Sequence, residues 1–386
     1  MISRNFTGIG IGIIGSGFAR RTQIPAFRAC EGARVAAIAS ARRERAQAVA
    51  REFAIPFVGD DWREVCKRED VDLVSIVTPP STHLEMTLYA LAHGKAVLCE
   101  KPMALSAAET GEMCRAANAA GGLSLIDHEL RFLEGRRRLR ELLHAGEIGR
   151  VRHVAVTYRA DSRAGAERAW DWWSDARMGG GALGAIGSHV VDSLHWLLGA
   201  EVSRVLCQLS THVQARPALD ADGGQVLRPV TTDDAANLIF NFSGVGSDLI
   251  AAAGASANAS LSFVEAGTPL HRLEIFGERG AFRVEGDGEL WQAEMDAGAW
   301  RLVETERGEL APGMQDNGWS RGFARFAQKI VRALGEGQNT VAGAATFADG
   351  HRTQLVLDAA RRSHRNGSWA TVDEESFDGA RWDDLA

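Results

Sequence analysis

In the first third of the chain, short apolar runs alternate with helix-like segments, and this alternation constrains the fold more than any other feature. Apolar runs predict strands at 10–15, 34–40, 71–80, 95–102 and 123–132. Helical patterns such as RRERAQAVAREF and THLEMTLYALAHG lie between them. Strands joined by helices pair in parallel and are covered on both faces. The sequence therefore predicts an α/β domain with a doubly wound parallel sheet, whose last strand runs out toward a second domain.

From about residue 150 the pattern changes to strand-like pieces that follow one another with glycine-rich turns. They are VRHVAVTYRA, VSRVLCQLST, AANLIFNFS, SDLIAAAGAS and HRLEIFGERGAFRVEG, and only 214–229 is expected to form a long loop. Helical patterns return at WSRGFARFAQKIVRALGEG and FADGHRTQLVLDAARRSHRNG. Successive strands of this kind predict a largely antiparallel, open-faced sheet in an α+β domain. We expect the two domains to comprise residues 1–128 and 129–386.

Composition fits a globular protein with two cores, because the 386 residues are 45% hydrophobic and 24% charged. The net charge of -7 argues against a nucleic-acid partner. Five widely spaced cysteines indicate reduced thiols and hence a cytoplasmic location. The opening MISRNFTG lacks the apolar core of a signal peptide, and no apolar run reaches the roughly 18 residues of a membrane span. We therefore expect a soluble protein without a membrane partner.

The first predicted strand ends in a glycine-containing turn that leads into a helical pattern. Its residues are Gly15, Ser16, Gly17, Phe18 and Ala19. Glycines in this context let the backbone approach a pyrophosphate at a helix N-terminus, which predicts a dinucleotide-binding Rossmann domain. The usual third small residue would stand where this chain has Arg20. Either Ala19 takes that role in a shorter loop, or the segment is an ordinary tight turn.

The second predicted strand ends in Ser40, Ala41, Arg42 and Arg43, without the acid that usually binds the ribose hydroxyls of NAD. A hydroxyl and two guanidinium groups suit a 2′-phosphate instead. A charge-assisted hydrogen bond is worth about 1.5–3 kcal/mol. The pattern therefore favours NADP over NAD as cofactor, unless the arginines only open a solvated helix.

Motifs along nearly the whole chain resemble one enzyme family. They are the GSG turn, TPPSTH at 78–83, GKAVLCEKP at 94–102, ELRF at 129–132, HAGEIGRV at 144–151, GGGALGAIGSHVVD at 179–192 and DGHRTQLVLDAARRS at 349–363. Together they resemble the glucose–fructose oxidoreductase and inositol dehydrogenase family, written Gfo/Idh/MocA. The resemblance implies an NAD(P)-dependent oxidoreductase that forms a homodimer or homotetramer through the open face of its second sheet.

The EKP motif places Glu100 and Lys101 at the end of a predicted strand, where ligands of a doubly wound sheet bind. We predict that both line the cofactor site and that Lys101 is catalytic, since an ammonium can hydrogen-bond a substrate oxygen and pass protons. The resemblance implies a cis bond before Pro102.

The TPPSTH motif supplies Thr78, Pro79, Pro80 and His83 to the predicted cofactor loop. The prolines stop the strand and shape the loop. Thr78 and His83 are available for hydrogen bonds to the cofactor or to the neighbouring loop, although His83 equally suits the role of a cap on its own helix.

A second candidate site lies on the helix predicted from GGGALGAIGSHVVDSLHWLLG. Ala185, His189 and Asp192 follow one another at i, i+4 and i+7 on one face. We predict that His189 is catalytic together with Lys101, and that Asp192 orients it or contacts the substrate. In the family the residue at position 185 is commonly an aspartate, so the alanine leaves the usual pair of groups incomplete.

Other polar residues complete the predicted substrate site. His128 and Arg131 lie at the end of the strand that enters the second domain, and Trp172 lies in the loop before the glycines. Tryptophans here stack on a sugar ring or form core or subunit contacts. No Cys-x-x-Cys, His-x-x-x-His or His-Glu-x-x-His spacing occurs, so no metal is expected.

These features together predict an oxidoreductase that transfers hydride between NAD(P) and a secondary alcohol or carbonyl of a carbohydrate-like molecule. Two alternatives stay open. One is a non-redox lyase or glycosidase of the same fold that uses its cofactor transiently. The other is a non-catalytic NADP-binding regulatory protein, which the alanine at position 185 makes conceivable.

Overall fold

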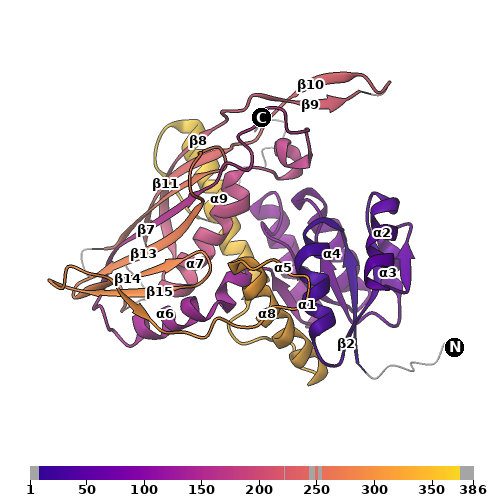
Figure 1. The fold of residues 1–386 in the computed structure, drawn as a ribbon, viewed down its shortest axis with the longest axis horizontal. Coiled ribbons are helices and arrows are strands. Elements are labelled where there is room, and N and C mark those ends of the chain that lie inside the picture. The colour runs from indigo at the N-terminus through magenta and orange to yellow at the C-terminus, as the bar shows by residue number, and fades with distance from the viewer. Residues whose placement is uncertain (1–7, 221, 243–247, 251–253, 374–386) are drawn as a thin grey trace. The chain divides into compact units, whose positions relative to one another are not determined.

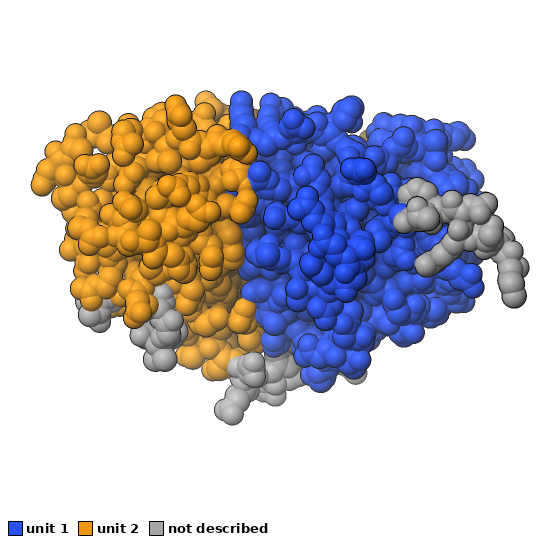
Figure 2. Space-filling model, turned by 90° about the horizontal axis from the view of Figure 1, so that it is seen from below, with its two compact units in different colours: residues 1–104, 108–133, 307–351 blue, residues 105–107, 134–306, 352–386 orange. Residues whose placement is uncertain are grey.

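A computed structural model describes residues 8–220, 222–242, 248–250 and 254–373. The chain forms two compact units, which Figure 2 colours separately. Unit 1 comprises 1–104, 108–133 and 307–351, and unit 2 comprises 105–107, 134–306 and 352–386.

Unit 1, which includes the strand labelled β2 in Figure 1, contains a seven-stranded sheet. The order of its strands is β17-β6-β5-β4-β1-β2-β3. The strands are β1 (Ile9–Ile14), β2 (Ala33–Ala39), β3 (Phe57–Gly59), β4 (Leu73–Ile76), β5 (Ala96–Cys99), β6 (Ser124–Ile126) and β17 (Ala345–Thr346). All neighbours pair in parallel except β17, which is antiparallel to β6. The predicted doubly wound parallel sheet is therefore confirmed.

The strand predicted over 123–132 is shorter than expected. It ends at Ile126, and Glu129–Phe132 form a 3₁₀ turn, η3. A β-carbon at Gly322 would lie 2.4 Å from the main-chain oxygen of Glu129, so the turn packs directly on helix α8 (Gly318–Gly335). This tertiary contact replaces the extended conformation that the local apolar pattern predicts.

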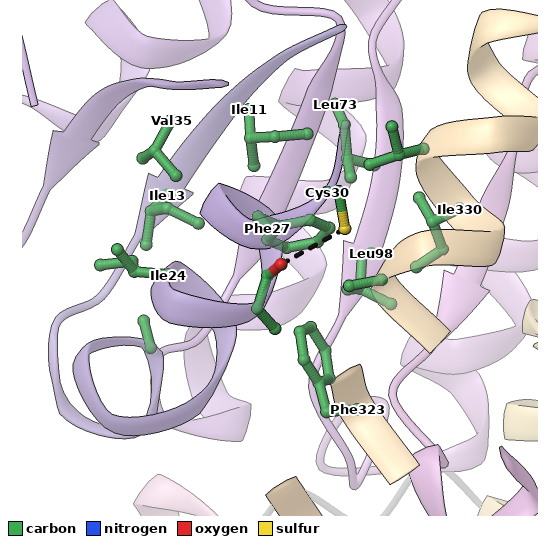
Figure 3. Packing of buried hydrophobic residues seen from close by; sticks show 14 of the residues in the cluster. Ile11, Ile13, Ile24, Phe27, Cys30, Val35, Leu73, Leu98, Phe323 and Ile330 are labelled. Carbon is green, nitrogen blue, oxygen red and sulfur yellow. Dashed lines mark hydrogen bonds between the residues drawn. The ribbon is translucent and has the colours of Figure 1, made fainter. Parts of the chain in front are cut away.

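Helices cover unit 1 with apolar side chains. They include α1 (Ile24–Ala29), α2 (Arg43–Phe53), α3 (Trp62–Lys67), α4 (His83–Ala92), α5 (Ala107–Ala120), α8 and the start of α9 (Phe347–Asn366). Figure 3 shows Phe27 of α1 and Phe323 of α8 packed with strand side chains such as Leu98. The two rings meet edge to face with their centroids 5.5 Å apart.

Residues 307–351 return to unit 1 because the apolar face of α8 belongs to the same core as α1. The compact units therefore do not divide at one point in the sequence. The division into 1–128 and 129–386 stays a prediction about domains, and the units describe how the chain packs.

Unit 2 contains a nine-stranded sheet in the order β16-β15-β14-β13-β7-β12-β11-β8-β18. The strands are β7 (Val151–Arg159), β8 (Val202–Ser210), β11 (Ala235–Phe242), β12 (Ser256–Ser262), β13 (Leu270–Gly277), β14 (Gly280–Glu285), β15 (Leu290–Glu294), β16 (Arg301–Val303) and β18 (Ala370–Thr371). Only β7 and β12 pair in parallel among these strands. The largely antiparallel sheet is thus confirmed.

Helices α6 (Glu134–His144) and α7 (Ser188–Leu198) also belong to unit 2. Along β11 the exposed Ile239 stands between the buried Leu238 and Phe240, which is the alternation of a sheet with one covered face. The oligomer expected through the open face stays a prediction.

The segment 214–229 is not the long loop that the sequence predicts. It forms a two-stranded antiparallel ribbon of β9 (Ala215–Leu219) and β10 (Gln225–Pro229). The side chain of Asp220 closes the turn by accepting a hydrogen bond from the main-chain nitrogen of Gly224 at 2.6 Å. A contact of this kind between an aspartate and a following glycine is typical of turns, and the hydrophobic pattern of the segment does not reveal it.

The strand expected at SDLIAAAGAS falls partly outside the described residues, and its described part includes a single bridge between Ile250 and Val151. Among the described residues, no helix is long and apolar enough to span a membrane. The cytoplasmic location and the absence of nucleic-acid and membrane partners stay predictions.

Candidate active site

Six strands of unit 1 end at the same edge of the sheet, because β1, β2, β3, β4, β5 and β6 run in one direction. The residues that follow them include Gly15, Ser40, Thr78, Glu100 and Asp127. Strand β1 lies between β2 and β4, where the strand order reverses. Ligands of doubly wound sheets bind at this point, outside the carboxyl ends of the strands.

The turn after β1 has the geometry of a phosphate-binding loop. Gly15 has φ +107°, and a β-carbon there would lie 2.2 Å from the main-chain oxygen of Val77, so only glycine fits. At Gly17 a β-carbon would meet nothing within 4 Å, which leaves open space beside the backbone. The hydroxyl oxygens of Ser16 and Ser40 are 3.2 Å apart and join the turn to the end of β2.

The residues after Gly17 separate into a packed and an exposed group. Phe18 precedes the π-helical turn η1 (Ala19–Gln23), in which Ala19 is fully buried. The neighbouring Arg20 is exposed, and its Nε donates to Glu52 at 2.6 Å. These positions agree with the alternative in which Ala19 is the small packed residue of the turn.

The polar side chains at the end of β2 differ in their exposure and in their contacts within the protein. Arg43 begins α2 and forms an ion pair with Asp60, and both side chains are exposed. Arg42 is exposed and extended at the N-cap position of the same helix. Ser40 is partly buried beside Ser16. The glycine cradle fits the pyrophosphate of a dinucleotide, and Ser40 and Arg42 are placed at the strand end next to it.

His83 ties two loops of unit 1 together. Its Nδ1 lies 3.2 Å from the main-chain oxygen of Met103, and its Nε2 lies 2.9 Å from that of Thr78. The ring is fully buried, and burial lowers its pKa. Helix α4 begins at His83 itself, with Thr82 at the N-cap. The interpretation as a helix cap is therefore wrong. Main-chain oxygens of two loops lie next to the two ring nitrogens, and the predicted contact of His83 with a cofactor stays a prediction.

Prolines shape the same loop, as the sequence predicts. Pro79 is extended, and Pro80 begins the 3₁₀ turn η2 (Pro80–Thr82). The hydroxyl of Thr82 donates to Thr78 Oγ1 at 2.7 Å, so the Thr78 hydroxyl is held in place at the strand end.

Lys101 is partly buried directly after β5, and its bond to Pro102 is cis, as the resemblance implies. The main-chain nitrogen of Lys101 donates to Glu100 Oε2 at 3.3 Å. Glu100 Oε1 accepts from Gln23 Nε2 at 3.0 Å. Glu100 therefore holds the loop internally, and its predicted contact with the cofactor stays a prediction.

The segment after β6 is buried throughout. His128 and Arg131 are 2% and 6% exposed, and Arg131 forms an ion pair with Asp349 at 3.5 Å. The charge of Arg131 is thus balanced inside unit 1. Its predicted contact with a substrate would require a group that shares this ion pair.

In unit 2, a glycine turn precedes the helix that carries His189. A β-carbon at Gly180 would lie 2.0 Å from the main-chain oxygen of Trp173, and one at Gly181 would lie 2.4 Å from Asp233 Oδ1. Asp233 Oδ2 accepts from the main-chain nitrogen of Leu183 at 2.7 Å. The glycines are required because the backbone packs directly on these groups. Burial raises the pKa of Asp233 to about 6.

The face predicted for Ala185, His189 and Asp192 assumed a regular α-helix, and that assumption is wrong. Leu183–Gly187 form a π-helical turn, η6, and α7 begins only at Ser188. Hydrogen bonds in a π-turn span five residues, so Ala185 does not keep the α-helical register to His189. Both His189 and Asp192 are buried, at 2% and 3% exposure.

The tryptophans of unit 2 differ in their surroundings. Arg228 stacks 3.7 Å from the ring centroid of Trp170, and Arg163 stacks 4.1 Å from that of Trp173. Trp172 is 41% exposed, whereas Trp170 and Trp173 are partly buried, and its predicted contact with a substrate stays a prediction.

Sequence reasoning missed Gln23, Ser75, Asp127 and Asp233. Asp127 carries the same signal as Glu100, because each is the first polar residue after an apolar strand. No local motif marks the other three. Among the described residues, no group of three or more His, Cys, Asp or Glu side chains is arranged to hold a metal ion.

The geometry defines a doubly wound dinucleotide-binding fold, and comparison with known proteins identifies its family. Residues 9–128 match the oxidoreductase family with an NAD-binding Rossmann fold, and residues 136–283 match the GFO/IDH/MocA C-terminal domain. The chain belongs to the Gfo/Idh/MocA family. The glucose-fructose oxidoreductase domain-containing protein 2 of Xenopus laevis is 30% identical over 94% of this chain and 94% of that protein.

Sugar dehydrogenases are among the similar proteins. The levoglucosan dehydrogenase of Pseudarthrobacter phenanthrenivorans is 28% identical over 95% of this chain and 99% of its own. A solved levoglucosan dehydrogenase complex with NADH and levoglucosan has a TM-score of 0.82 and 26% identity, and covers 95% of this chain and 100% of that chain. An oxidoreductase domain protein from Kribbella flavida has a TM-score of 0.82 and 29% identity over 95% and 100% of the two chains.

The two glycines of the first turn should respond differently to a methyl group. We expect Gly15→Ala to lower the free energy of unfolding by about 1–3 kcal/mol through its strained φ, and by more through the clash with Val77. Gly17→Ala should change it by less than about 0.5 kcal/mol, since its β-carbon meets open space. Urea unfolding of both variants measures the difference. Equal stability of the two would contradict the described turn.

Proposed function

We propose that this protein transfers hydride between NAD(P) and a secondary alcohol or carbonyl of a sugar, polyol or related hydroxylated ring. The observation that carries the proposal is Lys101 at the carboxyl edge of the sheet that also carries the glycine turn, in a chain similar to levoglucosan dehydrogenase. Solved complexes of that enzyme contain NADH with levoglucosan or with L-sorbose. The exposed Trp172 supplies an aromatic surface suited to a sugar ring.

In this proposal the glycine turn holds the pyrophosphate and the Thr78 loop covers the cofactor. A bound nicotinamide supplies the hydride acceptor or donor. Lys101 hydrogen-bonds the reacting oxygen of the substrate and exchanges its proton. His189, buried on α7 of unit 2, acts as the second acid or base, with Asp192 on the next turn to orient it.

Assays with sugars, sugar acids, inositols and diols, each with NAD(H) and NADP(H), test the function. Net formation or consumption of reduced cofactor with at least one of them supports the proposal. Product formation without a net change in cofactor absorbance would show the non-redox alternative, with transient cofactor use. Tight cofactor binding with no product from the whole panel would favour the regulatory alternative.

Lys101→Ala and His189→Ala should each lower kcat by about 10²–10⁴, the usual effect of a positioned acid or base. Cofactor affinity should change little, because neither group is proposed to bind the pyrophosphate or ribose. Lys67→Ala and His93→Ala are matched controls, since both residues are exposed on helix ends. Steady-state kinetics and fluorescence titration of the cofactor measure the two effects. Full activity of His189→Ala would remove this residue from the mechanism.

The polar groups after β2 further support NADP(H) as the preferred cofactor. Ser40 and Arg42 provide a hydroxyl and a guanidinium at the strand end, and none of the residues 40–43 is an acid. Arg43 already has Asp60 as an ion-pair partner. A 2′-phosphate is therefore best served by Ser40 and Arg42, with Arg43 contributing less than the sequence alone predicts.

Replacement of Arg42 should separate the two cofactors. We expect Arg42→Ala to weaken NADP(H) about tenfold or more and to leave NAD(H) nearly unchanged, because a charge-assisted hydrogen bond is lost only with the phosphate. Arg43→Ala, the matched control, should have a smaller effect. Binding titrations with both cofactors measure this. Equal losses for NAD(H) and NADP(H) would refute the 2′-phosphate assignment.

A further inference from the structure

Glu100 and Asp127 lie side by side at the carboxyl ends of two paired strands. Strand β5 pairs with β6 up to Cys99 and Ile126, and the main-chain nitrogen of Asp127 donates to the oxygen of Cys99 at 2.8 Å. The next residues of both strands are therefore neighbours. Asp127 is fully buried, and Glu100 is partly buried beside Lys101.

One amide joins the two carboxyl groups. Gln23 Nε2 donates to Glu100 Oε1 at 3.0 Å and to Asp127 Oδ2 at 2.9 Å. Gln23 Oε1 accepts from the hydroxyl of Ser75 at 2.6 Å, which fixes the orientation of the amide. Both amide hydrogens are thus used, one for each carboxyl group.

An oxygen of each carboxyl group therefore lies within 3.0 Å of the same amide nitrogen, and a proton shared by the two groups would let one of them donate to the other. Asp127 Oδ1 is buried, and no donor among the described residues serves it as an acceptor. A buried carboxylate oxygen without a donor is costly, whereas a protonated carboxyl group carries no charge to be compensated. Two adjacent carboxylates in a buried site would also repel each other strongly.

We propose that Glu100 and Asp127 share one proton, which resides on Asp127, so that the pair carries a single negative charge beside Lys101. Electrostatics agree with this geometry. Burial raises the pKa of Asp127 well above its ordinary value, and the charges of Glu129 and Glu100 raise it further. Burial also raises the pKa of Glu100, but the ammonium of Lys101 opposes that shift, which leaves the charge on Glu100.

Several other groups surround the pair and enter any titration. Cys99, Lys101 and Glu129 interact electrostatically with the pair. The other titratable or charged groups of the neighbouring segments are His128, the ion pair of Arg131 with Asp349, and His83, whose pKa the charge of Lys101 lowers. Burial raises the pKa of Cys99 well above its ordinary value, so its thiol stays neutral. Glu129 opposes ionisation of Asp127, and Lys101 favours the charge on Glu100.

The functional part of this inference rests on the proposed role of Lys101. The pair positions Lys101, because Glu100 accepts a hydrogen bond from its main-chain nitrogen. The pair also sets the local charge, since one negative charge stabilises the ammonium less than two would. The shared proton therefore keeps Lys101 able to exchange protons with a substrate hydroxyl, and Glu100 and Asp127 are positioning residues.

The stability of Asp127→Asn against pH tests the shared proton without any substrate. An unfolded aspartate loses its proton near pH 3.9, whereas the folded protein keeps it to a much higher pH. The folding constant of the wild type should therefore fall about tenfold per pH unit relative to the variant, from about pH 4 up to the raised pKa. Asparagine removes this slope because it cannot ionise. A constant ratio of the two folding constants would overturn the proposal.

Asp70→Asn is the matched control in the same unit. Burial raises the pKa of Asp70, but hydrogen bonds and charges from Arg68 and Arg34 outweigh burial and lower it. The ratio of the wild-type folding constant to that of Asp70→Asn should be constant above about pH 5. It should change only at lower pH, where the wild type loses stability as pH falls. If Asp127→Asn fails to fold, infrared spectra of the wild type with ¹³C-labelled aspartate decide. A protonated carboxyl band above pH 7 supports the proposal, and its absence refutes it.

The pH dependence of kcat tests the role of the pair for Lys101. Asp127→Asn preserves the single negative charge on Glu100. The acidic limb of the plot of kcat against pH for alcohol oxidation should therefore keep its wild-type position. Glu100→Gln/Asp127→Asn removes that charge, and the limb should move to lower pH by about one unit, because the neutral amine is then favoured. An unmoved limb in the double variant would refute the positioning role. If no substrate is turned over, the proposed function fails, while the stability measurement still decides the shared proton.

Discussion

The close packing of the first strand is the constraint on which the rest of unit 1 depends. A β-carbon at Gly10 would lie 1.9 Å from the main-chain oxygen of Asp70, and one at Gly12 would lie 2.5 Å from Val65 Cγ1. Strand β1 is central, with β2 on one side and β4 on the other. Larger residues would push β1 away from the segment at Asp70 and from Val65 of helix α3. The turn at Gly15 and the groups at the other strand ends would then lose their common edge.

The polar groups at that edge are held mainly by buried hydrogen bonds and not by exposed ion pairs. His83 lies between main-chain oxygens of two loops, and Gln23 lies between two carboxyl groups while Ser75 orients it. Buried hydrogen-bonded networks hold side chains in one geometry because breaking them leaves polar groups unsatisfied. Lys101 therefore lies on a loop whose backbone has few alternative conformations. Such a loop suits a side chain that must be held close to the reacting atom of a substrate.

Unit 2 positions His189 with a related arrangement. Gly180 and Gly181 let the backbone approach Trp173 and Asp233. The Asp233 carboxylate holds the start of the π-turn by accepting a hydrogen bond from the main-chain nitrogen of Leu183. A π-turn changes the helical register just before α7. The direction in which His189 projects thus depends on the packing of the turn as well as on the helix. The alanine at position 185 must be judged in this altered register.

The sequence by itself determined the elements that local chemistry controls. Apolar runs ended by polar residues identified the strands of the parallel sheet, and with them Gly15 and Lys101 at the strand ends. The family resemblance followed from motifs of the same kind. These features are readable because strand periodicity, glycine turns and prolines act over a few neighbouring residues.

Tertiary structure decided what depends on contacts between distant segments. Gln23 forms hydrogen bonds with Glu100 and Asp127, which lie 77 and 104 positions away in the sequence. Arg43 of α2 forms an ion pair with Asp60, which follows β3. The return of 307–351 to unit 1 has the same origin, since α8 packs on α1. No local sequence pattern predicts these contacts. The order of strands in the sheet and the packing of helices on it set the distances between such side chains. The proton shared by two carboxyl groups is therefore a property of the fold and not of either motif.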